Sequence, residues 1–329
     1  MKKNKAFSLV ELSVVILIIG ILIAGVTQSG RLIRQIKLST ARSVTSSSDV
    51  NSIRDVTGWF EASTEGSFRI AGGSSEIQND DEITEWHDYN TQKSAFDKPT
   101  LVNSTAGTYP KYRSNGINGI PAVYFDGTND YISFELGSGT TDPKFPVINK
   151  DRNFSIFTVF RADPGALGSN NMTITQLSGL PVSNALTNET YAGIGFFAAN
   201  KPGLIVNSTE ANNYLVNFAL KDQTDYIVGA VADFPVEDAT DPTRASVKMY
   251  LNSTAVASQI TGGTLKNVGV GIQRFIIGSG NLAASNFFKG LIAEVIVFDR
   301  ALKKEEAQSV MKYLQKKYGI KDISLATDL

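Results

Sequence analysis

Residues 7–26 read FSLVELSVVILIIGILIAGV, and this stretch decides the architecture of the chain. Twenty residues at 1.5 Å each make a helix roughly 30 Å long, which matches the hydrocarbon core of a bilayer. Glu11 is the one charged residue in the run. Basic residues flank it on both sides: Lys2, Lys3 and Lys5 before it, and Arg31, Arg34, Lys37 and Arg42 after it. The pattern predicts a transmembrane helix with a membrane interface at each end.

Two other interpretations of this segment are a secretory signal peptide and an uncleaved signal anchor. The apolar core of a signal peptide has about 7–15 residues, whereas this run has twenty and contains an acid close to its start. A carboxylate within a membrane helix costs roughly 2.5–3.5 kcal/mol when it is central, so its default role is functional, with a cationic partner. We expect the partner of Glu11 to be an amine.

Residues 5–11 read KAFSLVE, and they resemble the processing site of type IV prepilins. The resemblance implies that a prepilin peptidase cuts between Ala6 and Phe7 on the cytoplasmic side of the membrane and methylates the new amine of Phe7. It also implies that this amine, with an ordinary pKa of about 7.7–8.0, pairs with Glu11 of a neighbouring pilin subunit during filament assembly. Ala6 is a departure, because the family most often has glycine before the cut.

The pattern after residue 26 stays helical, with apolar residues at i, i+3 and i+4 among basic ones, and it predicts an amphipathic stalk. The run Thr45-Ser46-Ser47-Ser48-Asp49 predicts the end of the stalk, because short polar side chains compete for backbone hydrogen bonds. We expect a second short helix from Val50 to Gly58. The expected divisions of the chain are a leader at residues 1–6, a transmembrane and stalk helix at 7–54, and a head domain at 55–329.

From Trp59 onward, short β-branched and aromatic runs alternate with Gly, Asn, Ser and Thr, which predicts many short strands. Polar and apolar residues alternate along residues 155–160, so one face of that strand is expected to be buried. The expected strands are residues 123–125, 131–134, 155–160, 192–198, 226–232, 246–251, 274–277 and 293–298. The predicted fold class is α+β: a long N-terminal helix followed by a mainly antiparallel β-sandwich of the jelly-roll type and a C-terminal helix.

Four segments of the head resemble the concanavalin A-like (laminin G-like) sandwiches. They are residues 58–63, 83–88, 122–131 and 288–302. The last of these reads FKGLIAEVIVFDRAL and looks like that family's final strand with the short helix that follows it. The resemblance implies the sandwich fold and, as in members of the family, carbohydrate or another surface ligand as a partner.

The C-terminal helix is expected to play a structural role. Asp299 is expected to cap it, with Lys316 and Lys317 in its last turn and Gly319 just beyond. An apolar stripe is expected to dock it on the edge of the sandwich: Ala307, Val310, Met311, Leu314 and Tyr318.

Candidate ligand and catalytic residues are few. Asp126, Asn129 and Asp130 could supply oxygen ligands to calcium, although the same residue types favour turns without an ion; we expect no other cofactor. His87 is the single histidine of the chain, and we interpret it as a structural residue at a strand end. Glycosidase chemistry needs two carboxylates about 5–9.5 Å apart, and Glu294 has no second acid at strand spacing, so we do not expect it to be catalytic.

Composition excludes several classes of function. The chain has 329 residues and no cysteine, which excludes disulfides, thiolate metal sites and nucleophilic thiols. Its 31 basic and 32 acidic residues leave a net charge of −1, so no basic field recruits nucleic acid.

We therefore expect a non-enzymatic pilin or minor pilin. It would reside in the inner membrane before assembly with other pilin subunits into an extracellular filament, and it would display a lectin-like head for adhesion or surface recognition. The alternatives are a pseudopilin of a type II secretion system and a membrane-anchored carbohydrate-binding protein that does not polymerise.

Overall fold

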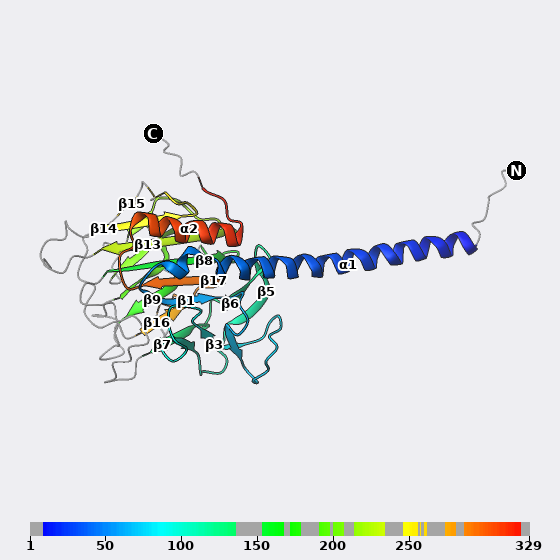
Figure 1. The fold of residues 1–329 in the computed structure, drawn as a ribbon, viewed down its shortest axis with the longest axis horizontal. Helices are drawn as coiled ribbons and strands as arrows, with labels where there is room; N and C mark the ends of the chain where they lie inside the picture. Colours follow the sequence, from blue (N-terminus) through cyan, green and yellow to red (C-terminus); the bar gives the residue numbers. More distant parts are fainter. Residues whose placement is uncertain are drawn as a thin grey trace, which may run out of the picture.

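A long helical arm and a β-sandwich make up the molecule. The computed structural model describes residues 9–135, 153–167, 172–178, 191–197, 200–206, 214–233, 246–255, 257, 260–261, 274–280 and 286–323. Helix α1 (Leu9–Ser46) has 38 residues and extends away from the sandwich, so that only its C-terminal end lies on the sandwich (Figure 1). The 3₁₀ turn η1 (Asp49–Ser52) follows α1, and helix α2 (Lys304–Tyr318) lies near the C-terminal end of the chain.

The strands form two sheets in which every pair is antiparallel among the described residues. The first sheet has seven strands in the order β14 (Ser246–Leu251), β13 (Asp225–Asp233), β8 (Phe154–Ala162), β17 (Lys289–Phe298), β6 (Ile120–Asp126) and β5 (Lys111–Ile117), and β1 (Val56–Glu61) also pairs with β17. The second has ten in the order β15 (Ile260–Thr261), β12 (Tyr214–Val216), β11 (Lys201–Val206), β10 (Tyr191–Phe197), β9 (Met172–Ser178), β16 (Arg274–Ile277), β7 (Ile132–Glu135), β4 (Thr100–Val102), β3 (Ile83–His87) and β2 (Phe68–Ile70). The predicted α+β class with an antiparallel sandwich is confirmed.

An aromatic core lies between the two sheets. Phe60 packs edge-on against Trp86 of the opposite sheet, with 6.2 Å between the ring centroids. Phe160 contacts Phe196 of the opposite sheet at 5.2 Å and Phe288 at 6.2 Å. These rings are at most 1% exposed, and burial of each contributes roughly 1.5–3 kcal/mol. This core holds the two sheets together.

The outer face of the seven-stranded sheet is a second buried surface. Trp59 points into this outer layer, whereas its neighbour Phe60 points into the core between the sheets, as the two-residue period of a strand requires. The end of α1, η1 and α2 cover the layer. Ser155 and Thr158 are both fully buried, so the expectation of a single buried face for residues 155–160 is wrong; the helices cover the other face.

Helix α2 lies across this outer face, not on the edge of the sandwich as expected. All five residues of its predicted apolar stripe are buried against the sheet. The predicted cap is also wrong: the helix begins at Lys304 after Lys303, and the Glu306 carboxylate accepts a hydrogen bond from Lys303 N at 2.8 Å. Arg300 holds that carboxylate through two contacts of 2.7 Å. Lys303 therefore occupies the N-cap position, four residues after Asp299.

The serine-rich run ends α1 as predicted, but no helix from Val50 to Gly58 follows it. The hydroxyl of Ser48 accepts a hydrogen bond from Val50 N at 3.1 Å and caps η1. Strand β1 then starts at Val56, and its aromatic pair alternates between two buried layers. Each expected strand lies in an observed strand apart from Tyr131, which just precedes β7, and Ala198, which falls outside the described residues.

Candidate functional site

The first candidate site is the exposed surface of α1. From Leu9 to Ile23 its large apolar side chains are 48–84% exposed. Among the described residues, α1 is the helix long and apolar enough to cross a membrane by length and composition. Glu11 lies in its first turn. The predicted cleavage site, Ala6 and Phe7, falls outside the described residues.

An exposed apolar stripe continues along α1 beyond the predicted membrane segment. Leu32, Ile33 and Ile36 are 57%, 54% and 55% exposed. At 3.6 residues per turn they share one face of the helix, and Arg31 and Arg34 lie on the opposite face. Exposed apolar side chains that are contiguous mark interaction surfaces. This stripe is a second candidate contact surface on the arm.

Hydrogen bonds and an ion pair from polar side chains hold the C-terminal end of α1 on the sandwich. Lys37 Nζ donates to the backbone oxygen of Asn118, in the turn between β5 and β6, at 3.0 Å. Arg42 Nε donates to the backbone oxygen of Ser63 at 2.8 Å, and Arg42 Nη1 lies 2.6 Å from Glu65 Oε1. These contacts begin only at Lys37, so the helix before it projects away from the head.

A buried ionic cluster lies beneath this junction, and we call it the Lys317 cluster: Lys317, Glu61 and Glu294. The ammonium of Lys317 on α2 is 2.7 Å from Glu61 Oε2 on β1 and 2.8 Å from Glu294 Oε2 on β17. All three side chains are 0% exposed. Glu61 and Glu294 are direct cross-strand partners. Burial of ions at this depth is costly unless each is paired and hydrogen-bonded.

Aromatic donors complete the environment of Glu294. Its Oε1 accepts from Trp59 Nε1 at 2.6 Å and from the Tyr313 hydroxyl at 2.7 Å, and its Oε2 accepts from the Tyr318 hydroxyl at 2.9 Å. The Tyr313 hydroxyl is also 3.1 Å from the hydroxyl of Thr45 on α1. The cluster therefore connects the sheet, α2 and the end of α1.

The pKa shifts agree with an ionised pair of Lys317 and Glu61. Burial disfavours the carboxylate of Glu61, but the charge of Lys317 and hydrogen bonds from Lys317, Ser63 and Thr64 outweigh it and lower the pKa of Glu61 to about 2. Burial likewise disfavours the ammonium of Lys317, but the two carboxylates raise its pKa above the ordinary value. Because one cation contacts two carboxylates, we interpret the Lys317 cluster as a structural feature of the fold.

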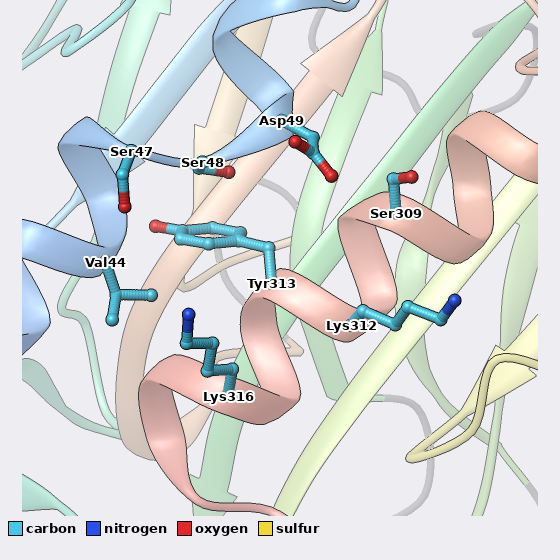
Figure 2. Close-up of a pocket in the computed structure, with 8 residues that line it drawn as sticks. All are labelled: Val44, Ser47, Ser48, Asp49, Ser309, Lys312, Tyr313 and Lys316. Atoms are coloured by element: carbon cyan, nitrogen blue, oxygen red, sulfur yellow. The ribbon is translucent and has the colours of Figure 1, made fainter.

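A groove of about 190 Å³ lies above the cluster, between the end of α1, η1 and α2 (Figure 2). The ring of Tyr313 forms its floor, and Lys312 and Lys316 extend from α2 beside it. Side chains from both helices line it: Val44, Ser47, Ser48, Asp49, Ser309, Lys312, Tyr313 and Lys316. The groove marks where the two helices do not pack fully against each other.

The predicted calcium residues lie in the turn after β6. Asp126 Oδ1 accepts from the backbone N–H groups of Thr128 and Asn129 at 2.7 and 3.3 Å, and Asp130 Oδ2 accepts from Asp126 N at 2.9 Å. The side-chain amide of Asn129 donates to Gly107 O at 3.1 Å. These bonds fix the turn. Calcium binding here stays a prediction.

Two other candidate residues have structural partners. His87 Nε2 lies 2.9 Å from Glu85 Oε2 on the same strand. No second acid lies at strand spacing from Glu294 along β17, but Glu61 on β1 faces it across the ladder. A signal for Lys317 was present in the sequence, because it falls three residues after Leu314 on the buried stripe of α2. Glu61 could be identified as a member of the cluster only from the register between β1 and β17, which pairs it with Glu294.

Asp88 is a further buried acid. It is 5% exposed, and its Oδ1 accepts from Trp59 N at 2.8 Å and from Asn90 N at 2.9 Å. Its Oδ2 has no hydrogen-bond partner in the described part of the chain. Burial raises the pKa of Asp88 to about 6, although the two backbone bonds and nearby lysines oppose the shift.

These features define a class of protein in which an exposed apolar N-terminal helix carries a β-sandwich. The comparisons with known proteins agree for the N-terminus: residues 1–27 match the family described as "Prokaryotic N-terminal methylation motif". The chain therefore carries the predicted prepilin-type motif. The motif implies processing by a prepilin peptidase and assembly with other pilins, and it fits anchoring in a membrane before assembly. No curated protein sequence matches the chain.

Solved structures with similar folds include a Trypanosoma rangeli sialidase in complex with sialic acid. The TM-score is 0.49 at 11% identity, over 79% of this chain and 32% of that one. The CBM40 of a Ruminococcus gnavus IT-sialidase has a TM-score of 0.40 at 13% identity, over 58% of this chain and 96% of that one. This chain thus spans about a third of the length of the sialidase.

Proposed function

We propose that this chain is a structural subunit, a pilin or minor pilin, of a type IV pilus-like surface filament. A prepilin peptidase cuts between Ala6 and Phe7, and the amine of Phe7 is methylated. The observation that carries the proposal is that the methylation motif at residues 1–27 includes the first part of α1, whose apolar side chains are exposed on every side. Lipid covers this surface before assembly, and other copies of the helix cover it afterwards.

Glu11 is the assembly residue in this proposal. The cut removes Lys2, Lys3 and Lys5 and creates one amine, four residues before Glu11 in the chain. In a filament core the amine of Phe7 on one subunit pairs with Glu11 of a neighbour. Pairing compensates two charges that would each be costly in an apolar surrounding, and it sets the register between subunits.

The stripe of Leu32, Ile33 and Ile36 extends this contact beyond the membrane segment. Its side chains are more than half exposed and lie beyond the apolar run at residues 7–26. Packing against the helices of neighbouring copies buries them, and the basic face with Arg31 and Arg34 stays outside.

The sandwich is displayed outside the cell for adhesion or surface recognition, with carbohydrate as the ligand class. Support for this ligand class comes from the four segments that resemble concanavalin A-like sandwiches. The methylation motif favours a structural role over an enzymatic one.

The test of processing is mass spectrometry of the mature N-terminus, which should begin with a methylated Phe7. A protein that still begins at Met1, or that begins beyond residue 26, refutes the proposal. Glu11→Ala should insert into the membrane but enter filaments poorly. Glu76→Ala, which removes an exposed acid of the head, is the matched control and should assemble normally.

The contact between stalks can be tested by disulfide cross-linking, because the chain has no cysteine of its own. Ile36→Cys should give cross-linked dimers in filaments under oxidising conditions, whereas Arg34→Cys on the opposite face should not. Equal cross-linking at both positions would refute packing through the apolar stripe.

The two alternatives differ from this proposal in measurable ways. A pseudopilin of a type II secretion system has the same motif and processing, but deletion of the gene blocks secretion of a cargo protein and extracellular filaments lack the chain. A membrane-anchored carbohydrate-binding protein that does not polymerise is unaffected in function by Glu11→Ala.

A further inference from the structure

The polar contacts that hold α1 on the head converge on one place, the last turn of α2. Within the described parts of the chain, three side chains of α1 make these contacts, namely Lys37, Arg42 and Thr45, and they are spread over slightly more than two turns of the helix. Apart from the ion pair of Arg42 with Glu65, each contact can be followed through one or two residues to Lys317 or to its neighbour Tyr318.

The first contact passes through the turn between β5 and β6. Lys37 Nζ donates to Asn118 O at 3.0 Å, and the side-chain amide of Asn118 donates to the backbone oxygen of Tyr318 at 2.9 Å. Asn118 has a φ of 49° and Gly119 a φ of 80°, so the turn is a tight one that presents this amide to α2.

The second contact passes through the turn after β1. Arg42 Nε donates to Ser63 O at 2.8 Å. That turn is held by the Glu61 carboxylate, which accepts from Ser63 N at 3.0 Å and from Thr64 N at 2.6 Å. Glu61 is in turn held by Lys317 at 2.7 Å. The position of the arginine's acceptor therefore depends on the Lys317 cluster.

The third contact is direct. The Thr45 hydroxyl is 3.1 Å from the hydroxyl of Tyr313, which donates to Glu294 and lies 3.2 Å from Lys317 Nζ. All of these groups are buried. An ionic cluster of this kind adds little net stability compared with apolar residues, but in some proteins such a cluster fixes one geometry.

We propose that the last turn of α2 is the anchor of the N-terminal arm, and that the Lys317 cluster fixes the angle between α1 and the sandwich. The groove between α1 and α2 supports this inference, because apolar packing alone does not fill the space between the two helices. The aromatic core between the sheets contains none of the anchoring residues. The arm can therefore loosen while the sandwich stays folded.

The test is a distance measurement on the full chain in detergent micelles, before any assembly. Two cysteines introduced by Gln35→Cys on α1 and Lys248→Cys on β14, both at exposed positions, carry spin labels for pulsed dipolar spectroscopy. The parent protein should give a narrow distance distribution. Lys317→Met should broaden it, and Lys316→Met, which changes the exposed lysine next to it, should leave it narrow.

A second variant, which leaves no buried charge without a partner, distinguishes loss of the anchor from unfolding of the head. The triple change Lys317→Met, Glu61→Gln and Glu294→Gln removes the ionic contacts while nearly keeping the shapes of the side chains, and it should also broaden the distribution. Tryptophan fluorescence shows whether the head is folded, since Trp59 and Trp86 both lie in it. A narrow distribution in the folded triple variant, or equal broadening in Lys316→Met, overturns the proposal. Because filaments are not involved, the outcome is independent of the proposed function.

Discussion

Asp88 should make the head less stable at neutral pH than at pH 4. Its carboxyl is 5% exposed, and burial raises its pKa from 3.8 to about 6. Below pH 4 the group is protonated in both folded and unfolded chains and has no effect on the pH dependence. Between pH 4 and pH 6 it ionises in the unfolded chain but not in the folded one, so stability falls. Above pH 6 the loss is constant, and two pKa units correspond to about 3 kcal/mol.

The substitution Asp88→Asn isolates this contribution. Asparagine keeps an Oδ1 that accepts from Trp59 N and Asn90 N, but it carries no charge at any pH. The free energy of unfolding of Asp88→Asn relative to the parent should therefore rise by about 3 kcal/mol between pH 4 and pH 6 and then stay level. The lowered pKa of Glu61 acts in the opposite direction, chiefly below pH 4.5. It is the same in both proteins and cancels in the difference.

The measurement is urea unfolding of the full chain in a non-ionic detergent at a series of pH values, followed by tryptophan fluorescence. The two tryptophans of the chain, Trp59 and Trp86, are both buried in the sandwich, so the signal reports the head. Glu76→Gln removes an exposed carboxylate and is the control. A difference between Asp88→Asn and the parent that does not change with pH would refute the assignment of the penalty to this buried acid.

Two further substitutions test the packing of the head in the same assay. Lys317→Met leaves two buried carboxylates without their cation and should lower stability by about 3–5 kcal/mol, whereas Lys316→Met should change it by less than about 0.5 kcal/mol; equal effects would contradict the burial of the first lysine. Gly278→Ala should be more destabilising than Gly66→Ala. Both glycines have a positive φ, 91° at Gly278 and 76° at Gly66, but only at Gly278 would a new Cβ clash with the ring of Phe125. Gly66→Ala should cost about 1–2 kcal/mol from backbone strain alone, and a similar value for both would show that the aromatic ring can move aside.

Part of the architecture could be predicted from local pattern. The arm follows from an apolar run of helical length. Strands β14 and β16 have the predicted bounds, because β-branched and aromatic residues occupy them. Strands β2 and β4, with three residues each, are too short to give a period-two signal. The predicted helix from Val50 to Gly58 overlaps the first three residues of β1, whose buried residues serve two different layers, so that the strand lacks a simple alternation.

The candidate site also has a part that the sequence predicts and a part that only the fold explains. The sequence alone determined the N-terminal motif, the apolar arm and the position of Glu11, because insertion of a helix into lipid depends on the local run of side chains. Only the tertiary structure decided the roles of Glu61, Glu294 and Lys317. Lys317 and Glu61 are 256 residues apart in the chain. A charged side chain takes a structural role only when the fold removes it from water and places opposite charges and hydrogen-bond donors around it.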